Sequence, residues 1–106
     1  MNKGDIILVP FPFSDLSGNK LRPSLVIIET ERDITVAFIT TQIQWKEPTD
    51  MVLKPTTING LKKESLIRLS KLATIDKDIV VGRLGSLTVM EMVELNNNLK
   101  VILKLS

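Results

Sequence analysis

Six short runs rich in Ile, Val and Leu fill the first four-fifths of the chain and restrict the folds open to it. They are residues 5–9, 24–29, 34–41, 51–54, 65–69 and 79–81. Each has the length and composition of a strand, and the stretches between them contain Pro, Gly, Asn and Asp, which favour turns. Helical segments do not alternate with these runs, so a doubly wound parallel sheet is excluded. The pattern predicts an antiparallel sheet.

The last segment has the pattern of a helix. Thr88 is followed three residues later by Glu91, the spacing of a capping box, and Leu87 and Met92 are placed as a hydrophobic staple. Apolar residues then recur at helical spacing, at Met92, Leu95, Leu99 and Ile102. We expect an all-β to α+β fold, in which a small curled barrel of about five to seven strands carries a C-terminal helix on its surface.

The length and composition favour one soluble cytoplasmic domain. A chain of 106 residues matches a single domain, here residues 1–106. It has no Cys, which excludes disulfides and thiol catalysis and favours a reducing compartment. The apolar run at the N-terminus is short and broken by two prolines, so no secretory signal is expected, and no window approaches the roughly 20 apolar residues of a membrane-spanning helix.

The chain also lacks His, which removes the usual acid and base at neutral pH and the commonest metal ligand. Motifs for nucleotide hydrolysis, dinucleotide binding and elbow-type acyl transfer are missing as well. RNA cleavage remains open to such a chain, because RNA carries its own nucleophile, the 2′-hydroxyl. The protein then has only to orient the phosphate and neutralise its growing charge.

A guanidinium suits that task, because its planar fork can hold two phosphoryl oxygens. The candidates are Arg22, Arg68 and Arg83. Arg22 ends the long polar stretch 10–23, just before Pro23, where a loop is expected to meet a strand. The alternative is that Arg22 is only a solvent-exposed charge at the start of that strand.

Thr40, Thr41 and Gln42 end the third predicted strand with three hydrogen-bonding side chains. Hydroxyl groups at this position can bind a phosphate. The alternative is structural, because Thr is a favoured strand residue.

The same positions carry a resemblance to the MazF/PemK/Kid family of toxin endoribonucleases from type II toxin–antitoxin pairs. It covers nearly the whole chain and rests on five ordered motifs: GDIILVPFPFSDLSGNK, RPSLVII, FITTQIQ, ESLIRLSKLATID and the G-x-L turn at Gly82 to Leu84. The resemblance implies an SH3-like barrel with a C-terminal helix and a cytoplasmic homodimer. It further implies an mRNA interferase that cuts single-stranded RNA at short sequences, leaves a 2′,3′-cyclic phosphate and needs no metal or other cofactor.

The resemblance also implies site residues and partners. The arginine of the RP dipeptide corresponds to Arg22 and the threonine of the I-T-x-Q motif to Thr40, and we take these two as catalytic. The partners would be single-stranded mRNA and a separate, partly disordered, acidic antitoxin, with DNA reached only through the antitoxin. The candidates for RNA binding are Ser17, Asn19, Lys20, Thr41, Gln42 and Arg68.

Two positions depart from the pattern of the family. Some members carry an Asp after the arginine of the fifth strand, where this chain has Arg68 followed by Ser70. Others have a Glu in the first loop, where this chain offers Ser17, with Asp15 nearby. The identity of a general base is therefore open.

The net charge is only +2, so the placement of the cations matters more than their number. Those that can follow an RNA backbone are Lys20, Lys46, Lys62, Lys63, Arg68 and Lys71. Trp45, the only Trp, can stack an unpaired base, or it can pack a loop or contact a partner.

Two rival functions keep the same fold. A toxin of the CcdB kind would poison DNA gyrase by binding, without cutting RNA. A chain that had lost catalysis would survive as a binding module, which Ser70 permits. The RP and I-T-x-Q positions favour the nuclease over the gyrase-binding toxin.

Overall fold

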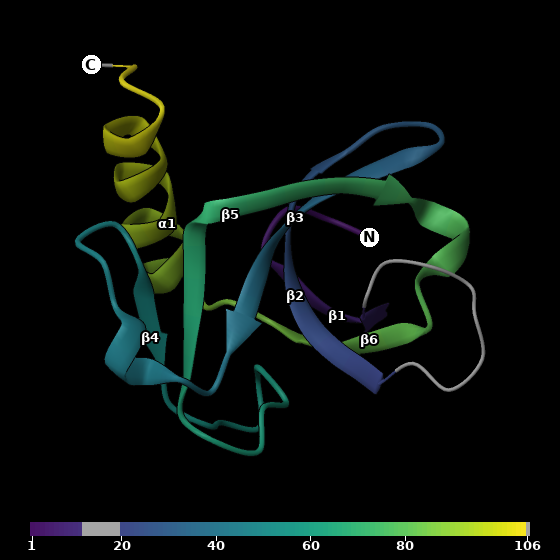
Figure 1. The fold of residues 1–106 in the computed structure, drawn as a ribbon, viewed down its shortest axis with the longest axis horizontal. Helices are drawn as coiled ribbons and strands as arrows, with labels where there is room; N and C mark the ends of the chain where they lie inside the picture. The colour runs from purple at the N-terminus through teal and green to yellow at the C-terminus, as the bar shows by residue number, and fades with distance from the viewer. Residues whose placement is uncertain (12–19, 106) are drawn as a thin grey trace.

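A computed structural model describes residues 1–11 and 20–105 and shows a curled sheet beside a C-terminal helix (Figure 1). The described strands are β1 (Asp5–Phe11), β2 (Lys20–Glu29), β3 (Asp33–Thr40), β4 (Met51–Leu53), β5 (Ser65–Asp76) and β6 (Gly82–Ser86). Two short 3-10 helices, η1 (Ile43–Trp45) and η2 (Lys77–Ile79), and the helix α1 (Val89–Ile102) complete them. The strand order is β4-β5-β3-β2-β1-β6, and every neighbouring pair is antiparallel. The expected antiparallel sheet with a terminal helix is confirmed, as a half-barrel.

Alternating side chains give the sheet two apolar faces, because successive residues of a strand point to opposite sides. Ile6 and Ile7, neighbours in β1, belong to different core clusters, and so do Leu25 and Val26 of β2. The first cluster includes Leu95 and Leu99 of α1 and so lies between sheet and helix. The second lies on the opposite face and is extended by partly buried residues at the end of η2.

β5 turns a corner in the middle, which curls the sheet (Figure 1). Its pairing with β3 is interrupted, because Ala37 lies opposite Leu72 while the next residue, Phe38, lies opposite Arg68. The intervening residues 69–71 have no partner in this ladder. Such extra residues bend a strand and increase its local twist. Arg68 is therefore the last residue before the corner.

The helix begins as predicted. The Thr88 hydroxyl accepts a hydrogen bond from the Glu91 backbone N–H at 3.2 Å, and the Glu91 carboxylate accepts one from the Thr88 backbone N–H at 2.8 Å. These bonds satisfy two amide groups that the first turn leaves open. Leu95 and Leu99 are buried, and Met92 and Ile102 pack against the same cluster. None of the helices in the described ranges has the length and apolarity to cross a bilayer.

Some predicted boundaries were wrong. The run 79–81 is not a strand: η2 occupies Lys77–Ile79, and the sixth strand starts at Gly82. β6 has the sequence GRLGS, without β-branched residues, and pairing with β1 holds it in place. The bounds of the expected loop 10–23 were wrong at both ends, because β1 continues to Phe11 and β2 begins at Lys20. Arg22 therefore lies within a strand, not at the end of a loop.

Gly85 is a position where this fold excludes a side chain. A Cβ on Gly85 would overlap the carbonyl oxygen of Ile58, which accepts a hydrogen bond from Ser86. We expect Gly85→Ala to lower the free energy of unfolding by about 1–3 kcal/mol, the usual cost of overpacking, as measured by urea denaturation. Gly82→Ala in the same strand is the matched control, because a Cβ there meets nothing within 4 Å. Equal stability of the two variants would contradict the packing of β6 described above.

Candidate active site

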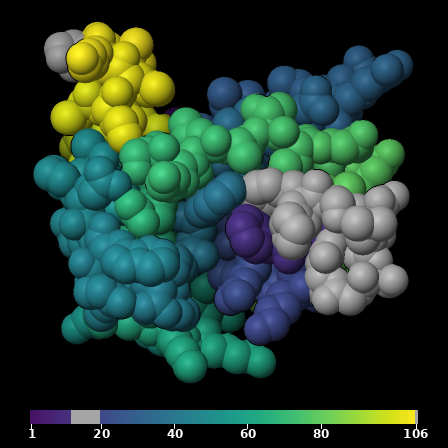
Figure 2. All heavy atoms as spheres, in the orientation of Figure 1, coloured from purple at the N-terminus to yellow at the C-terminus, as the bar shows by residue number. Residues whose placement is uncertain are grey.

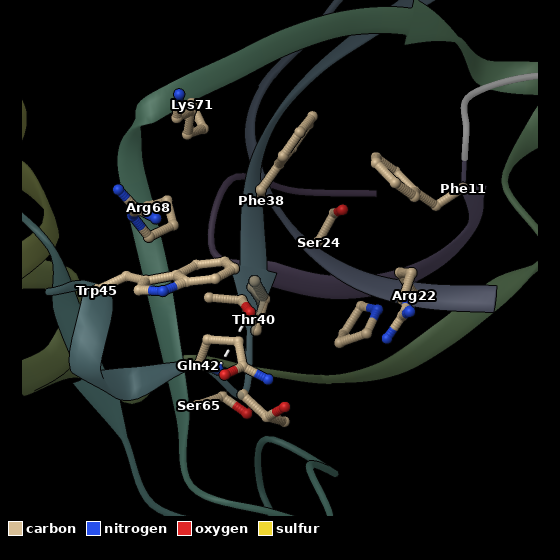
Figure 3. A pocket seen from close by; sticks show the side chains of 13 residues that line it. Phe11, Arg22, Ser24, Phe38, Thr40, Gln42, Trp45, Ser65, Arg68 and Lys71 are labelled. Atoms are coloured by element: carbon tan, nitrogen blue, oxygen red, sulfur yellow. Dashed lines mark hydrogen bonds between the residues drawn. The ribbon is translucent and has the colours of Figure 1, made fainter. Parts of the chain in front are cut away.

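One pocket opens where β1, β2, β3, η1 and β5 meet. Its volume is about 580 Å³. In the space-filling view this face is hollowed between the teal segment that follows β3 and the purple end of β1 (Figure 2). The lining residues are Phe11, Arg22, Pro23, Ser24, Phe38, Ile39, Thr40, Thr41, Gln42, Trp45, Ser65, Arg68 and Lys71 (Figure 3).

Arg22 and Thr40, the two predicted catalytic residues, both line this pocket. β2 and β3 run antiparallel, and Ser24 lies opposite Phe38. Arg22 and Thr40 lie two residues beyond this last pair of the ladder, at the same end of the two strands. Arg22 and Ser24 are two residues apart on β2, and Phe38 and Thr40 are two residues apart on β3. The four side chains therefore share one face of the sheet. The antiparallel register thus explains how residues distant in sequence reach the same pocket.

The Thr40 hydroxyl is held by the backbone that follows it. Its oxygen accepts a hydrogen bond from the Gln42 backbone N–H at 3.1 Å (Figure 3). A hydroxyl group has one hydrogen to donate in addition to its acceptor sites. Thr40 can therefore donate its own hydrogen to an anion in the pocket while its oxygen is fixed.

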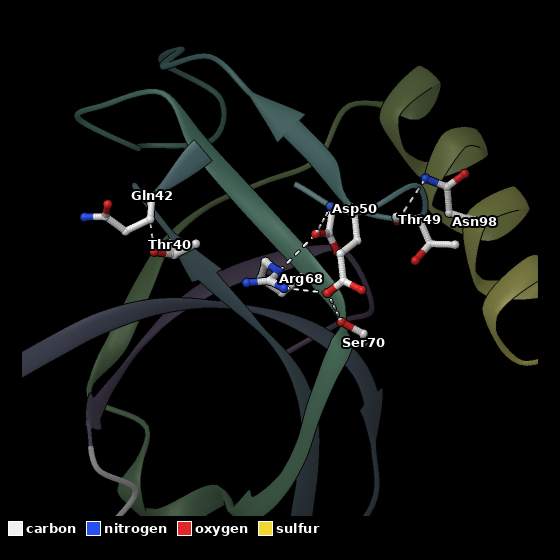
Figure 4. A network of polar contacts seen from close by, with 8 residues as sticks. Thr40, Gln42, Thr49, Asp50, Arg68, Ser70 and Asn98 are labelled. Carbon is white, nitrogen blue, oxygen red and sulfur yellow. Dashed lines mark hydrogen bonds and ion pairs between the residues drawn. The ribbon is translucent and has the colours of Figure 1, made fainter. Parts of the chain in front are cut away.

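Arg68 is anchored by two carboxylates from the segment between η1 and β4 (Figure 4). Its Nη2 donates to Glu47 Oε1 at 2.6 Å, and its Nε lies 3.0 Å from Asp50 Oδ2, an ion-pair contact without the alignment of a hydrogen bond. The Asp50 side chain is fully buried, whereas that of Glu47 is 52% exposed. The Ser70 hydroxyl also donates to Glu47 Oε1, at 3.3 Å.

This network distributes charge unevenly around the pocket. The hydrogen bond from Arg68, and then that from Ser70, hold the pKa of the Glu47 carboxyl below its usual value. Glu47 is therefore ionised at neutral pH, and together with Asp50 it gives Arg68 two negative partners. Arg22 is exposed, and within residues 1–11 and 20–105 its guanidinium has no ion-pair partner. Of the two arginines that line the pocket, Arg22 is the more accessible to an anionic ligand.

The other predicted residues divide into those that line the pocket, those that lie elsewhere and those outside the described ranges. Thr41, Gln42 and Arg68 line the pocket, and Lys71 is the lining lysine among the candidates for RNA binding. The remaining candidates do not line it: Lys20 on β2, and Lys46, Lys62 and Lys63. Arg83 of β6 also lies elsewhere, with its Nη2 3.4 Å from Asp5 Oδ1. Ser17 and Asn19, like Asp15, lie outside the described residues.

Sequence reasoning missed several groups that the fold brings here. Phe11, Phe38, Ser24 and Ser65 line the pocket, and Glu47 holds Arg68 from outside the lining. Side chains two residues apart on a strand share a face, so assigning Arg22 and Thr40 to strands would have predicted Ser24 and Phe38 on the same face. No comparable pattern points to Glu47, which is 21 residues from Arg68 in sequence. Within the described ranges, the acidic residues form no group of three or more that could hold a metal ion.

Comparisons with known proteins agree on one family. A model of the PemK-like, MazF-like toxins of type II toxin–antitoxin systems matches residues 2–103. No curated protein matches the chain significantly. Among solved structures, an endoribonuclease in complex with its cognate antitoxin from a mycobacterial species has a TM-score of 0.77 and 20% identity, covering 100% of this chain and 97% of that one.

Two further solved structures share the fold. The Mycobacterium tuberculosis toxin MazF-mt6 has a TM-score of 0.77 and 20% identity, covering 94% of this chain and 96% of its own. An endoribonuclease from a mycobacterial species has a TM-score of 0.74 and 18% identity, covering 98% and 91%. The family match spans nearly the whole sequence and confirms the resemblance noted from the five motifs. The chain belongs to the PemK-like, MazF-like family of toxins of type II toxin–antitoxin systems.

Proposed function

We propose that this toxin is a sequence-specific, metal-independent endoribonuclease that cuts single-stranded mRNA. The observation that carries the proposal is the convergence of Arg22 and Thr40 in one pocket, on a fold shared with solved endoribonucleases. The 2′-hydroxyl attacks the adjacent phosphorus, so a 2′-O–P bond forms as the bond from phosphorus to the 5′-oxygen breaks. The hydroxyl loses its proton, the leaving oxygen gains one, and a 2′,3′-cyclic phosphate remains.

Arg22 neutralises the phosphate as charge builds on its non-bridging oxygens. Its guanidinium is exposed to the pocket and hardly deprotonates in a protein, so its role is electrostatic. Thr40 donates its hydroxyl hydrogen to one of these oxygens, with its own oxygen held by the Gln42 amide. Orientation of the 2′-hydroxyl against the phosphorus supplies further acceleration.

Arg68 contributes differently, because Nη2 donates a hydrogen bond to Glu47 and Nε makes an ion-pair contact with Asp50. Its remaining N–H groups can reach a flanking phosphate from the wall of the pocket. Lys20, Thr41 and Gln42 complete the RNA-binding set within the described residues, and Ser17 and Asn19 are retained as candidates from the sequence. Ser70 replaces the acidic residue of some family members, and the Glu47 carboxylate lies beside it.

The partners follow from the family and from the charge of the site. An acidic antitoxin would cover the Arg22 end of the pocket, as a cognate antitoxin accompanies one solved neighbour. Contact with DNA would come only through that antitoxin, and both proteins would be cytoplasmic. We further propose a homodimer, because β4 ends the sheet of the described residues on one side and α1 exposes the apolar side chains of Val89, Met90, Val93 and Val101.

Arg22→Ala should reduce cleavage of a long unstructured RNA, assayed in chelator, by about 100-fold to 1000-fold, the cost of losing an electrostatic stabiliser of the transition state. Thr40→Val should cost about 10-fold to 100-fold, because it removes one hydrogen bond to a charged phosphoryl oxygen. Arg83→Ala is the matched control, since this arginine is 55% exposed and lies outside the pocket. Full activity in Arg22→Ala would remove the proposed site. Gyrase arrest without RNA fragments would assign the protein to the CcdB kind of toxin.

Glu47 should make the stability of the protein sensitive to acid. Folding lowers the pKa of the Glu47 carboxyl from its usual 4.5. The ionised carboxylate therefore contributes fully to the free energy of unfolding above pH 4.5, and this contribution is lost as the pH falls through the lower pKa of the folded state. Glu47→Gln should flatten the decline in the free energy of unfolding below pH 4.5, measured by urea denaturation across an acid series. Glu94→Gln, on an exposed part of α1, is the control. Parallel acid curves for Glu47→Gln and the parent would exclude this linkage.

The homodimer can be tested by light scattering after size-exclusion chromatography. The parent chain should elute with twice the mass of its 11.9 kDa monomer. Val93→Glu should shift it toward the monomer, because burying an unpaired carboxylate in an apolar interface is costly. Lys100→Glu changes an exposed position of the same helix and should leave the dimer intact. A monomeric parent would end the dimer proposal.

A further inference from the structure

Aromatic side chains are scarce in this chain and gather at one place. It has three Phe, one Trp and no Tyr. Phe11, Phe38 and Trp45 all line the pocket, and Phe13 lies outside the described residues. Phe11 and Phe38 pack edge to face, with ring centroids 5.8 Å apart. The pocket that holds Arg22 and Thr40 therefore also has an aromatic wall.

Trp45 is exposed to an extent that packing does not explain. It is 56% exposed, and η1, the short helix that ends with it, contributes no buried residue. Its backbone is nevertheless held in place, because the Trp45 N–H donates to the Gln42 carbonyl oxygen at 3.1 Å. Trp45 and Arg22 lie on opposite sides of Thr40 in the pocket (Figure 3). An exposed indole on a hydrogen-bonded backbone thus lies on one side of the proposed phosphate site.

The amide of Gln42 is oriented beside this ring. Gln44 Nε2 donates to Gln42 Oε1 at 2.7 Å, which occupies the acceptor end of the Gln42 side chain. The Gln42 Nε2 group, with its two hydrogens, remains as the donor end. Gln42 lines the pocket, whereas Gln44 does not. Gln44 is therefore a positioning residue that leaves a hydrogen-bond donor available beside the indole.

From these contacts we infer that Trp45 and Gln42 form a subsite for one base next to the cleaved phosphate, and that it selects keto bases over amino bases. The base stacks on the indole, which every base can do. Gln42 Nε2 then donates to the carbonyl oxygen of uracil or guanine, whereas cytosine and adenine present an amino group at the equivalent position. The inference rests on the proposed function in one respect, that RNA is the substrate.

The fluorescence of Trp45 provides a direct test, because it is the only Trp and the chain has no Tyr. We would titrate the full chain with short 2′-O-methyl RNAs, which cannot cleave themselves, carrying uracil, cytosine or an abasic site at successive positions. At one position the abasic substitution should abolish quenching and weaken binding about 10-fold, the scale of one base–aromatic stack. At that position uracil should bind about 5-fold more tightly than cytosine, the scale of one hydrogen bond.

Gln44 variants test the selection separately from stacking. Gln44→Leu should leave quenching intact and remove the preference between uracil and cytosine, because the Gln42 amide is free to rotate. Gln44→Glu presents only acceptors, so Gln42 Nε2 should turn toward it and expose Oε1, which reverses the preference toward cytosine. Gln42→Ala should abolish the preference in every background. An unchanged preference in both Gln44 variants would overturn the assigned role of the two amides.

The outcomes also separate this subsite from the proposed nuclease activity. RNA cleavage without quenching of Trp45, and with full affinity in Trp45→Ala, would overturn the subsite and leave the nuclease standing. Position-specific quenching by the 2′-O-methyl RNAs, without cleavage of unmodified RNA, would keep the subsite and reject the nuclease. Equal quenching by abasic and base-containing RNAs would overturn stacking, because only the backbone would then be recognised.

Discussion

The antiparallel register between β2 and β3 determines the chemistry of the pocket. It sets Ser24 opposite Phe38 and carries Arg22 to the same end of the sheet as Thr40. Since alternate residues of a strand face the same side, a slip of one residue would send these side chains to the opposite face. The adjoining residues Leu25 and Ala37 are buried in the first core cluster, so the same register also buries the core. The site and the stability of the fold therefore depend on one set of backbone hydrogen bonds.

The two arginines of the pocket differ in burial and in the carboxylates that they contact. Arg68 is held by a fully buried Asp50 and a half-exposed Glu47, and its side chain is only 12% exposed. Such a cation is rigid, but its field is largely cancelled by its partners. Arg22 is exposed and has no carboxylate partner within the described residues, so a phosphate meets its full charge. An anionic substrate is thus attracted chiefly by Arg22, while Arg68 helps to keep the wall of the pocket in place.

The sequence predicts those parts of the fold whose signals lie within a few neighbouring residues. β-branched runs and a capping box located most strands and the start of α1, because these signals act within a few residues. β6 escaped detection because GRLGS has no strand-forming side chains and depends on pairing with β1. Thr40 and Arg22 were predicted from motifs, and both line the pocket. Glu47 was not predicted, because its link to Arg68 exists only after β4 and β5 have paired.

The corner of β5 has a consequence for how proteins with this fold can diverge. Within a regular ladder, adding or removing one residue would move every following side chain to the wrong face. At residues 69–71 the ladder to β3 is already interrupted, and Ser70 and Lys71 are exposed. Pairing with β3 resumes at Leu72, so the two exposed positions belong to neither half of the ladder. The rim beside Arg68 can therefore vary at Ser70 and Lys71 while the half-barrel keeps its pairing, whereas burial in the core restricts Leu69.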